Sequence, residues 1–138
     1  SVDAMVASEP TPSLVEQKGA RELVSLGGLG NSYPLLLLAK TGTIEKRDDE
    51  IRRFVSALAR AERFIHRHPD ETAALLAKET GLSPALARKA MQRHSYKLQL
   101  DKTTRTSLEA TALFLKDQNK ISHLPTIERV IDPHYLKP

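Results

Sequence analysis

Cysteine is absent from this 138-residue chain, and aromatic residues make up only 4% of it. The absence of cysteine excludes disulfides, thiolate nucleophiles and zinc sites of the cysteine type. The scarcity of aromatic side chains leaves few candidates for stacking on nucleic-acid bases. The sequence also lacks any apolar run near the ~18 residues that a membrane-spanning helix needs. The sequence therefore predicts no thiol chemistry and no membrane-spanning helix, and it offers few side chains for base stacking.

The N-terminus lacks the features of a signal peptide, because the opening Ser1-Val2-Asp3-Ala4 follows no basic region or apolar core. The chain begins directly in a predicted strand. We therefore expect an N-terminal portion of the protein to be missing from this sequence.

Charge is present in both signs, with a net value of +4. Lys and Arg are interleaved with Asp and Glu, which is typical of a solvated surface rather than of a basic binding patch. Hydrophobic residues make up 40% and charged residues 28%, as in ordinary globular proteins. The length suits one domain with a moderate core.

Three segments in the first ~40 residues are predicted to be strands: Val2–Ser8, Arg21–Leu26 and Tyr33–Ala39. The unbroken leucines Leu35–Leu38 predict burial on both faces, as in a mostly parallel sheet covered by helices. Three short strands cannot complete such a sheet alone. We therefore expect an α/β fold whose sheet is completed by the rest of a larger protein or by a second copy of the chain.

Helical patterns follow, and the longest runs from Asp48 to about His68. Its apolar residues recur at helical spacing and predict one buried stripe, comprising Ile51, Phe54, Val55, Leu58, Ala61 and Ile65. Its arginines lie on the other faces: Arg52, Arg53, Arg60, Arg63 and Arg67. Asp48 is predicted to cap this helix, with acidic residues behind it that oppose the helix dipole.

The other predicted helices are a short one at Ser13–Lys18, one from Pro69 to a stop at Gly81, one after the Ser83 cap, one after the Asp101 cap, and a last turn at Ile127–Val130. Two inward faces are also predicted from spacing: Leu86, Ala87, Ala90 and Met91 on one helix, and Leu108, Ala112 and Leu115 on another.

Glu9 is a candidate ligand-binding residue because it follows the first predicted strand. Ligands of open α/β sheets gather at the carboxyl ends of the strands. Ser8 and Pro10 flank Glu9, and proline stiffens the loop. The alternative is a solvated carboxylate on a surface loop.

A second candidate segment is Gly27-Gly28-Leu29-Gly30, followed by Asn31, Ser32 and Tyr33. A phosphate-binding loop is not expected, because the Gly-Lys-Ser/Thr ending is missing and a predicted strand follows. The amide of Asn31 and the hydroxyls of Ser32 and Tyr33 are suited to orienting a small polar or anionic ligand. A tight turn around Asn31 is the alternative.

No catalytic residues, metal site or cofactor are expected. The five histidines form no ligand pair on one helix face with a supporting carboxylate. No nucleophile elbow is present. The cluster Asp48-Asp49-Glu50 is better explained as a helix start than as a catalytic group.

The order of these segments resembles a known family, the periplasmic solute-binding proteins of ABC importers for nitrate, taurine and aliphatic sulfonates, which includes relatives that bind thiamine-pyrimidine precursors. The resemblance covers essentially the whole chain. It is carried by Val2-Asp3-Ala4 leading to Glu9-Pro10, Gly30-Asn31-Ser32-Tyr33-Pro34, the helix from Ile51 to the break His68-Pro69-Asp70-Glu71, the segment Leu76–Pro84, and Ile131-Asp132-Pro133-His134-Tyr135-Leu136.

The resemblance implies a type II binding protein with two α/β lobes and a ligand cleft between them, of which this chain is the C-terminal portion. Residues 1–33 would be the end of the second lobe and the return crossover. Residues 34–138 would be the C-terminal part of the first lobe, one strand and then mainly helices. Ser8, which stands where many relatives have an aromatic residue, leaves the class of solute open.

The function that the resemblance implies is binding of a small anionic or polar solute in the periplasm, by closure of the cleft, and delivery to a membrane permease without catalysis. Ser8, Glu9, Pro10, Asn31, Ser32 and Tyr33 would contact the solute. No nucleic-acid partner is expected, and we expect a homodimer or a segment swap that completes the sheet.

Three other functions stay open at this point. A transcriptional regulator could use the same architecture to sense a ligand. A basic helical module could bind nucleic acid through the arginines of the Asp48 helix, with salt-dependent affinity. An enzyme of the pyrimidine-precursor type would need a catalytic residue in the missing part.

Overall fold

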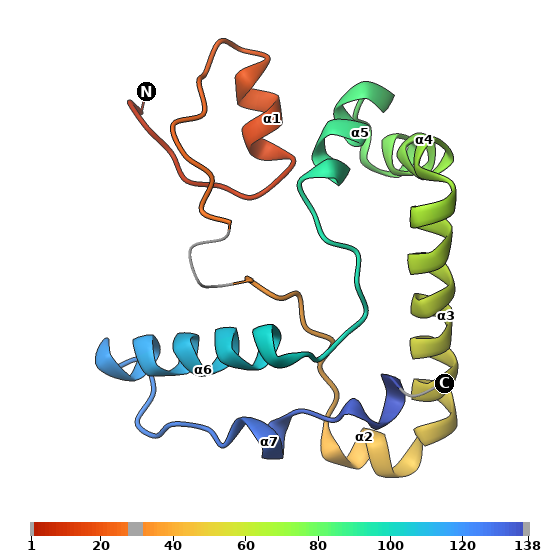
Figure 1. Cartoon of the computed structure of the whole chain (residues 1–138), viewed down its shortest axis with the longest axis vertical. Coiled ribbons are helices and arrows are strands. Elements are labelled where there is room, and N and C mark those ends of the chain that lie inside the picture. Colours follow the sequence, from red (N-terminus) through yellow and green to blue (C-terminus); the bar gives the residue numbers. More distant parts are fainter. Residues whose placement is uncertain (1, 28–31, 137–138) are drawn as a thin grey trace. The chain divides into compact units, whose positions relative to one another are not determined.

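The computed structural model describes residues 2–27 and 32–136, which form helices joined by irregular segments and contain no strand. Figure 1 shows the elements in chain order. They are α1 (Thr11–Glu16), α2 (Thr41–Lys46), α3 (Asp48–Arg67), α4 (Pro69–Thr80), α5 (Pro84–Gln92), α6 (Lys102–Asp117), α7 (Ile127–Val130) and a final 3-10 turn, η1 (Pro133–Leu136). The predicted α/β fold with a parallel sheet is therefore wrong.

The three predicted strands are irregular segments of the structure. Residues 2–8, 21–26 and 33–39 contain no strand. A strand is stable only when its backbone groups pair with a neighbour, and these segments pair with no other described segment as a ladder. The leucines show the consequence, since Leu35 and Leu38 are 103% and 83% exposed. An apolar run alone cannot distinguish a buried strand from an exposed extended segment.

The helix boundaries, in contrast, follow the capping signals of the sequence. The Ser83 hydroxyl accepts a hydrogen bond from the Leu86 N–H, and the Asp101 carboxylate accepts one from the Thr104 N–H. Gly81 ends α4 with a φ of 73° in the left-handed region, which glycine adopts without a steric penalty. The short helix begins earlier than predicted, at Thr11. α2, which ends at Lys46, was not predicted.

The chain forms two compact units, and the first comprises Ser1–Ser25 and Arg60–Lys97. Its core lies between α4 and α5, where small alanine side chains allow the two helices to approach closely. α1 also packs against α5. The buried apolar residues are Ala73, Ala77, Leu86, Ala87, Ala90 and Met91. The predicted inward face of α5 is confirmed in full.

The second unit comprises Leu26–Ala59 and Leu98–Pro138. α6 contacts α7, and the buried apolar residues of this unit are Val55, Ala112 and Ile127. On the predicted inward face of α6, Ala112 is buried, and Leu108 and Leu115 are half-buried.

A polar clasp joins the final 3-10 turn to the start of α3 in the second unit. Tyr135 donates its hydroxyl hydrogen to Asp48 Oδ1 at 2.6 Å, and Arg52 Nε donates to Asp48 Oδ2 at 2.7 Å. Arg52 also lies over the Tyr135 ring, 5.5 Å from its centre. His134 contacts Arg52 and is fixed through its backbone N–H, which donates to Asp132 at 2.9 Å. Asp48 is thus the first residue of α3 and not the predicted cap before it, and its carboxylate binds the side chains of Tyr135 and Arg52.

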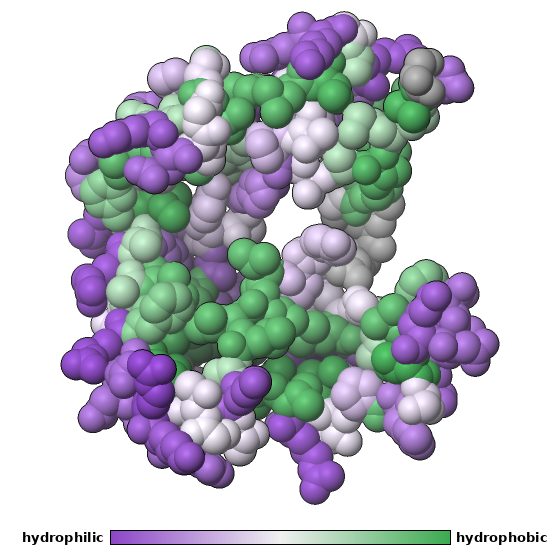
Figure 2. Space-filling view, turned by 180° about the vertical axis from the view of Figure 1, so that it is seen from behind, coloured by the Kyte–Doolittle hydropathy of each residue, from purple (hydrophilic) through white to green (hydrophobic). Residues whose placement is uncertain are grey.

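Much apolar surface stays exposed, as Figure 2 shows in its broad green areas. The long helix α3 has the predicted bounds, but only Val55 of its apolar stripe is buried. Phe54 is 51% exposed. Within the described part of the chain, no helix combines the length and apolar character needed to cross a membrane.

Candidate functional site

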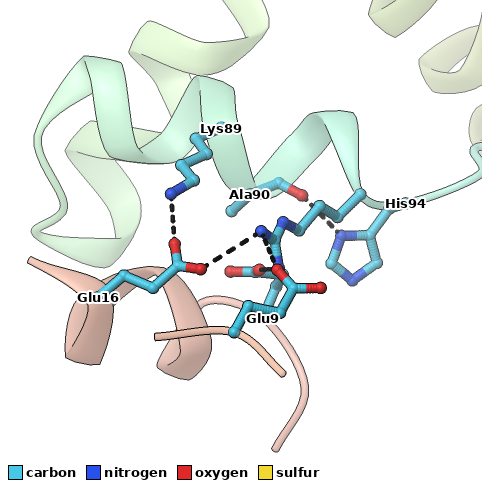
Figure 3. Close-up of polar contacts among 7 residues, drawn as sticks. Glu9, Glu16, Lys89, Ala90 and His94 are labelled. Carbon is cyan, nitrogen blue, oxygen red and sulfur yellow. Dashed lines mark hydrogen bonds and ion pairs between the residues drawn. The ribbon is translucent and has the colours of Figure 1, made fainter. Parts of the chain in front are cut away.

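Glu9 belongs to an ion-pair network in the first unit. The network joins the acidic residues around α1 to the basic end of α5, and Figure 3 shows these side chains converging. Arg93, which follows the last residue of α5, reaches Glu9 Oε1 with Nη1 at 3.2 Å. Its Nη2 lies 2.7 Å from Glu22 Oε2 and 3.6 Å from Glu16 Oε1. One guanidinium therefore faces three carboxylates.

A second cation, Lys89, completes the network one turn earlier on α5. Its ammonium group donates a hydrogen bond to Glu16. This hydrogen bond lowers the pKa of Glu16, and the positive charges of Lys89 and Arg93 add to the effect. The hydrogen bond to Glu22 is the largest of the interactions that raise the pKa of Arg93. The network contains three acidic and two basic side chains, so its formal charge is negative.

The Glu9 side chain is only 6% exposed. Its alternative description as a solvated loop carboxylate is therefore wrong. Both of its oxygens are buried without a hydrogen-bond donor among the described residues, because the contact with Arg93 has the distance but not the geometry of a hydrogen bond. Buried polar groups are nearly always hydrogen-bonded. Glu9 thus keeps unused capacity to accept hydrogen bonds.

The neighbours of Glu9 contribute through their backbones. The Ser8 carbonyl accepts from the Thr11 N–H at 3.2 Å, and the Pro10 carbonyl accepts from the Leu14 N–H at 3.0 Å. Both bonds begin α1 and so fix the position of Glu9. The side chains of Ser8 and Pro10 are exposed.

The remaining predicted site residues belong to the second unit. Ser32 binds the buried Ser107 of α6 twice, through its N–H at 2.8 Å and its hydroxyl at 3.0 Å. Tyr33 has a φ of 46° and an exposed fraction of 89%. Asn31 lies outside the described residues, as does the segment from Gly28 to Gly30. Ser8, Glu9 and Pro10 are therefore described in one unit, and Ser32 and Tyr33 in the other.

Sequence reasoning missed the partners of these residues. Arg93 and Glu22 are 71 positions apart, and Ser32 and Ser107 are 75 apart. The signal for Arg93 was its position after a helix, where cations favourably oppose the helix dipole. The spacing of residues in the sequence does not indicate that the C-terminal end of α5 contacts the segment around Glu9. The described residues contain no group of three side chains suited to holding a metal ion.

Comparisons with protein-family models, with curated proteins and with solved structures found no match for this chain.

Proposed function

We propose that the chain is part of the solute-binding component of an importer of the nitrate, taurine and aliphatic sulfonate type. The observation that carries the proposal is the buried carboxylate of Glu9, whose two oxygens lack a hydrogen-bond donor. The resemblance of the sequence to that family implies a ligand contact at this same residue. A polar group of the solute would supply the missing donor.

The chemistry of Glu9 restricts which part of the solute can face it. An ionised carboxylate only accepts hydrogen bonds, so the facing group must donate them. Arg93 already faces Glu9, Glu16 and Glu22. A solute with an amino group, such as taurine, satisfies Glu9 better than nitrate, which has no donor. Because both oxygens are covered, the solute reaches them only when the segment around Glu9 opens.

In this proposal the chain works in the periplasm and catalyses no reaction. The solute is enclosed by hinge closure and passed to a membrane permease. Ser8 and Pro10, which flank Glu9 in the first unit, are the other proposed contacts there.

Isothermal titration calorimetry with taurine, nitrate and an aliphatic sulfonate tests the proposal. We expect taurine to bind, and Glu9→Gln to weaken its binding about tenfold or more, because hydrogen bonds to charged groups contribute strongly. Glu22→Gln is the matched control, since Glu22 contacts the same guanidinium but is 36% exposed. The absence of binding by all three solutes would contradict the proposal, as would an equal loss in the control.

A further inference from the structure

A surface hollow of about 410 Å³ opens elsewhere in the first unit. It lies where the ends of α3 and α5 meet the start of α4 and the segment that follows α5. Ile65, Pro69 and Met91 give it an apolar lining, and Met91 is buried. A concave surface of this size, mostly apolar with a few polar groups, is typical of small-molecule sites.

Arg88 is one of the residues that line this hollow. Its partner is Asp70 of α4, whose side chain is 91% exposed, whereas that of Arg88 is 36% exposed. An ion pair this exposed contributes little to stability. A carboxylate brought by a ligand can therefore replace Asp70 at small cost, and the planar guanidinium fits a carboxylate through two parallel hydrogen bonds.

Two histidines hold the walls of the hollow in place. His66 Nε2 donates to the Tyr96 carbonyl at 2.8 Å, and His94 Nδ1 donates to the Ala90 carbonyl at 2.9 Å. A carbonyl oxygen only accepts, so the bonded nitrogen of each ring must carry the proton. The first bond fixes the segment after α5 against α3, and the second fixes the His94 ring against its own helix. The walls are thus formed before a ligand arrives.

We propose that this hollow binds a small organic acid. The apolar body of the acid packs against Ile65, Pro69 and Met91, and its carboxylate binds Arg88 in place of Asp70. This site is separate from the Glu9 network and does not depend on the proposed importer function.

The two methionines of the chain, Met5 and Met91, provide the measurement. With methyl-¹³C-labelled methionine, the methyl signal of Met91 reports on the hollow, and that of Met5, which does not line it, is an internal control. Hexanoate and hexylamine have unbranched apolar chains of similar length and differ in the charge of the head group. We expect hexanoate to shift the Met91 signal saturably, hexylamine to bind several-fold more weakly, and Met5 to stay unchanged.

Three variants identify the role of the head group. We expect Arg88→Gln to abolish the preference for hexanoate. Lys89→Gln removes the same charge from the next residue, which binds Glu16 instead, so hexanoate binding should persist. Asp70→Asn should strengthen hexanoate binding about two- to fivefold by releasing Arg88, and this exposed substitution keeps the test valid if Arg88→Gln does not fold.

Equal shifts of Met91 by hexanoate and hexylamine would overturn the proposal, because they would indicate apolar adsorption without recognition of the carboxylate. An unmoved Met91 signal, a parallel shift of Met5, or an equal loss in Lys89→Gln would overturn it as well.

Discussion

At the scale of single residues, Arg93 joins three carboxylates of the first unit. It is the cation nearest to the buried Glu9 carboxylate, at 3.2 Å. Removing one partner of a buried ion pair costs more than the pair contributes, because the remaining charge stays buried without compensation. The stability of this unit therefore depends on Arg93 and Glu9 together.

We expect Arg93→Gln to lower the thermal unfolding midpoint by several degrees, since it leaves Glu9 buried without a counter-charge. The double variant Glu9→Gln/Arg93→Gln should recover part of that loss, because no buried charge remains. Circular dichroism melting curves of the two single variants and the double variant give the coupling directly. Additive losses would show that Glu9 and Arg93 act independently.

In the second unit, Asp48 joins two side chains, those of Tyr135 and Arg52. The hydroxyl of Tyr135, followed by Arg52, lowers the pKa of Asp48. A lowered folded-state pKa adds stability above the unfolded-state value, and this stability is lost as the pH falls through the folded value. We expect Tyr135→Phe to raise the pKa of Asp48 toward its ordinary value. An NMR titration of the side-chain carboxyl carbon measures the change.

The same substitution should lower the unfolding midpoint at neutral pH, and its effect should shrink as the pH falls through the lowered folded-state pKa of Asp48. An unchanged Asp48 titration in Tyr135→Phe would show that the clasp does not set this pKa.

The residues that carry these effects were only partly predictable. Glu9 stood out because a proline follows it and a predicted strand precedes it. The burial of Glu9 could not be predicted, because its partner Arg93 follows a helix more than 80 positions later in the sequence. Asp48 was predicted as a cap from local signals, and the local pattern contained nothing about Tyr135. Long-range pairing depends on how distant segments pack within each unit, which the spacing of residues along one sequence does not reveal.

At the scale of elements, the sequence predicted the helices well because their boundaries are set by neighbouring residues. Ser83 and Asp101 each accept a backbone hydrogen bond within three positions. The strands were predicted wrongly because a strand requires a partner segment, and local pattern cannot supply one. The four leucines 35–38 give the same apolar pattern whether or not a second strand pairs with them.

The two caps differ in strength. Asp101 accepts from the Thr104 N–H at 2.8 Å and from its hydroxyl at 2.9 Å, whereas Ser83 accepts one bond at 3.3 Å. We expect Ser83→Ala to reduce the free energy of unfolding by about 1 kcal/mol, and Asp101→Ala by about 1–2 kcal/mol. Urea denaturation measures both. A larger loss in Ser83→Ala would contradict this order.

At the scale of the whole molecule, the exposed apolar surface is the property that remains to be explained. Leu35, Leu37 and Leu38 are 103%, 58% and 83% exposed in an extended segment. Monomeric soluble proteins rarely expose large contiguous apolar patches, and an extended segment with unpaired backbone groups favours association with another chain. The expectation of a homodimer or a segment swap therefore stays a prediction, and these leucines are its proposed contact.

We expect the purified chain to form dimers as its concentration rises, because association would remove these leucines from water at roughly 25 cal/mol per Å² of buried apolar surface. The double variant Leu35→Lys/Leu38→Lys should shift the equilibrium to monomer, since lysine in an extended segment opposes edge pairing. Leu113→Lys is the matched control, because Leu113 is 52% exposed but lies on α6. Sedimentation velocity over a range of concentrations measures all three proteins. A parent chain that stays monomeric throughout, or a control that dissociates as readily as the double variant, would show that residues 35–38 do not hold two copies together.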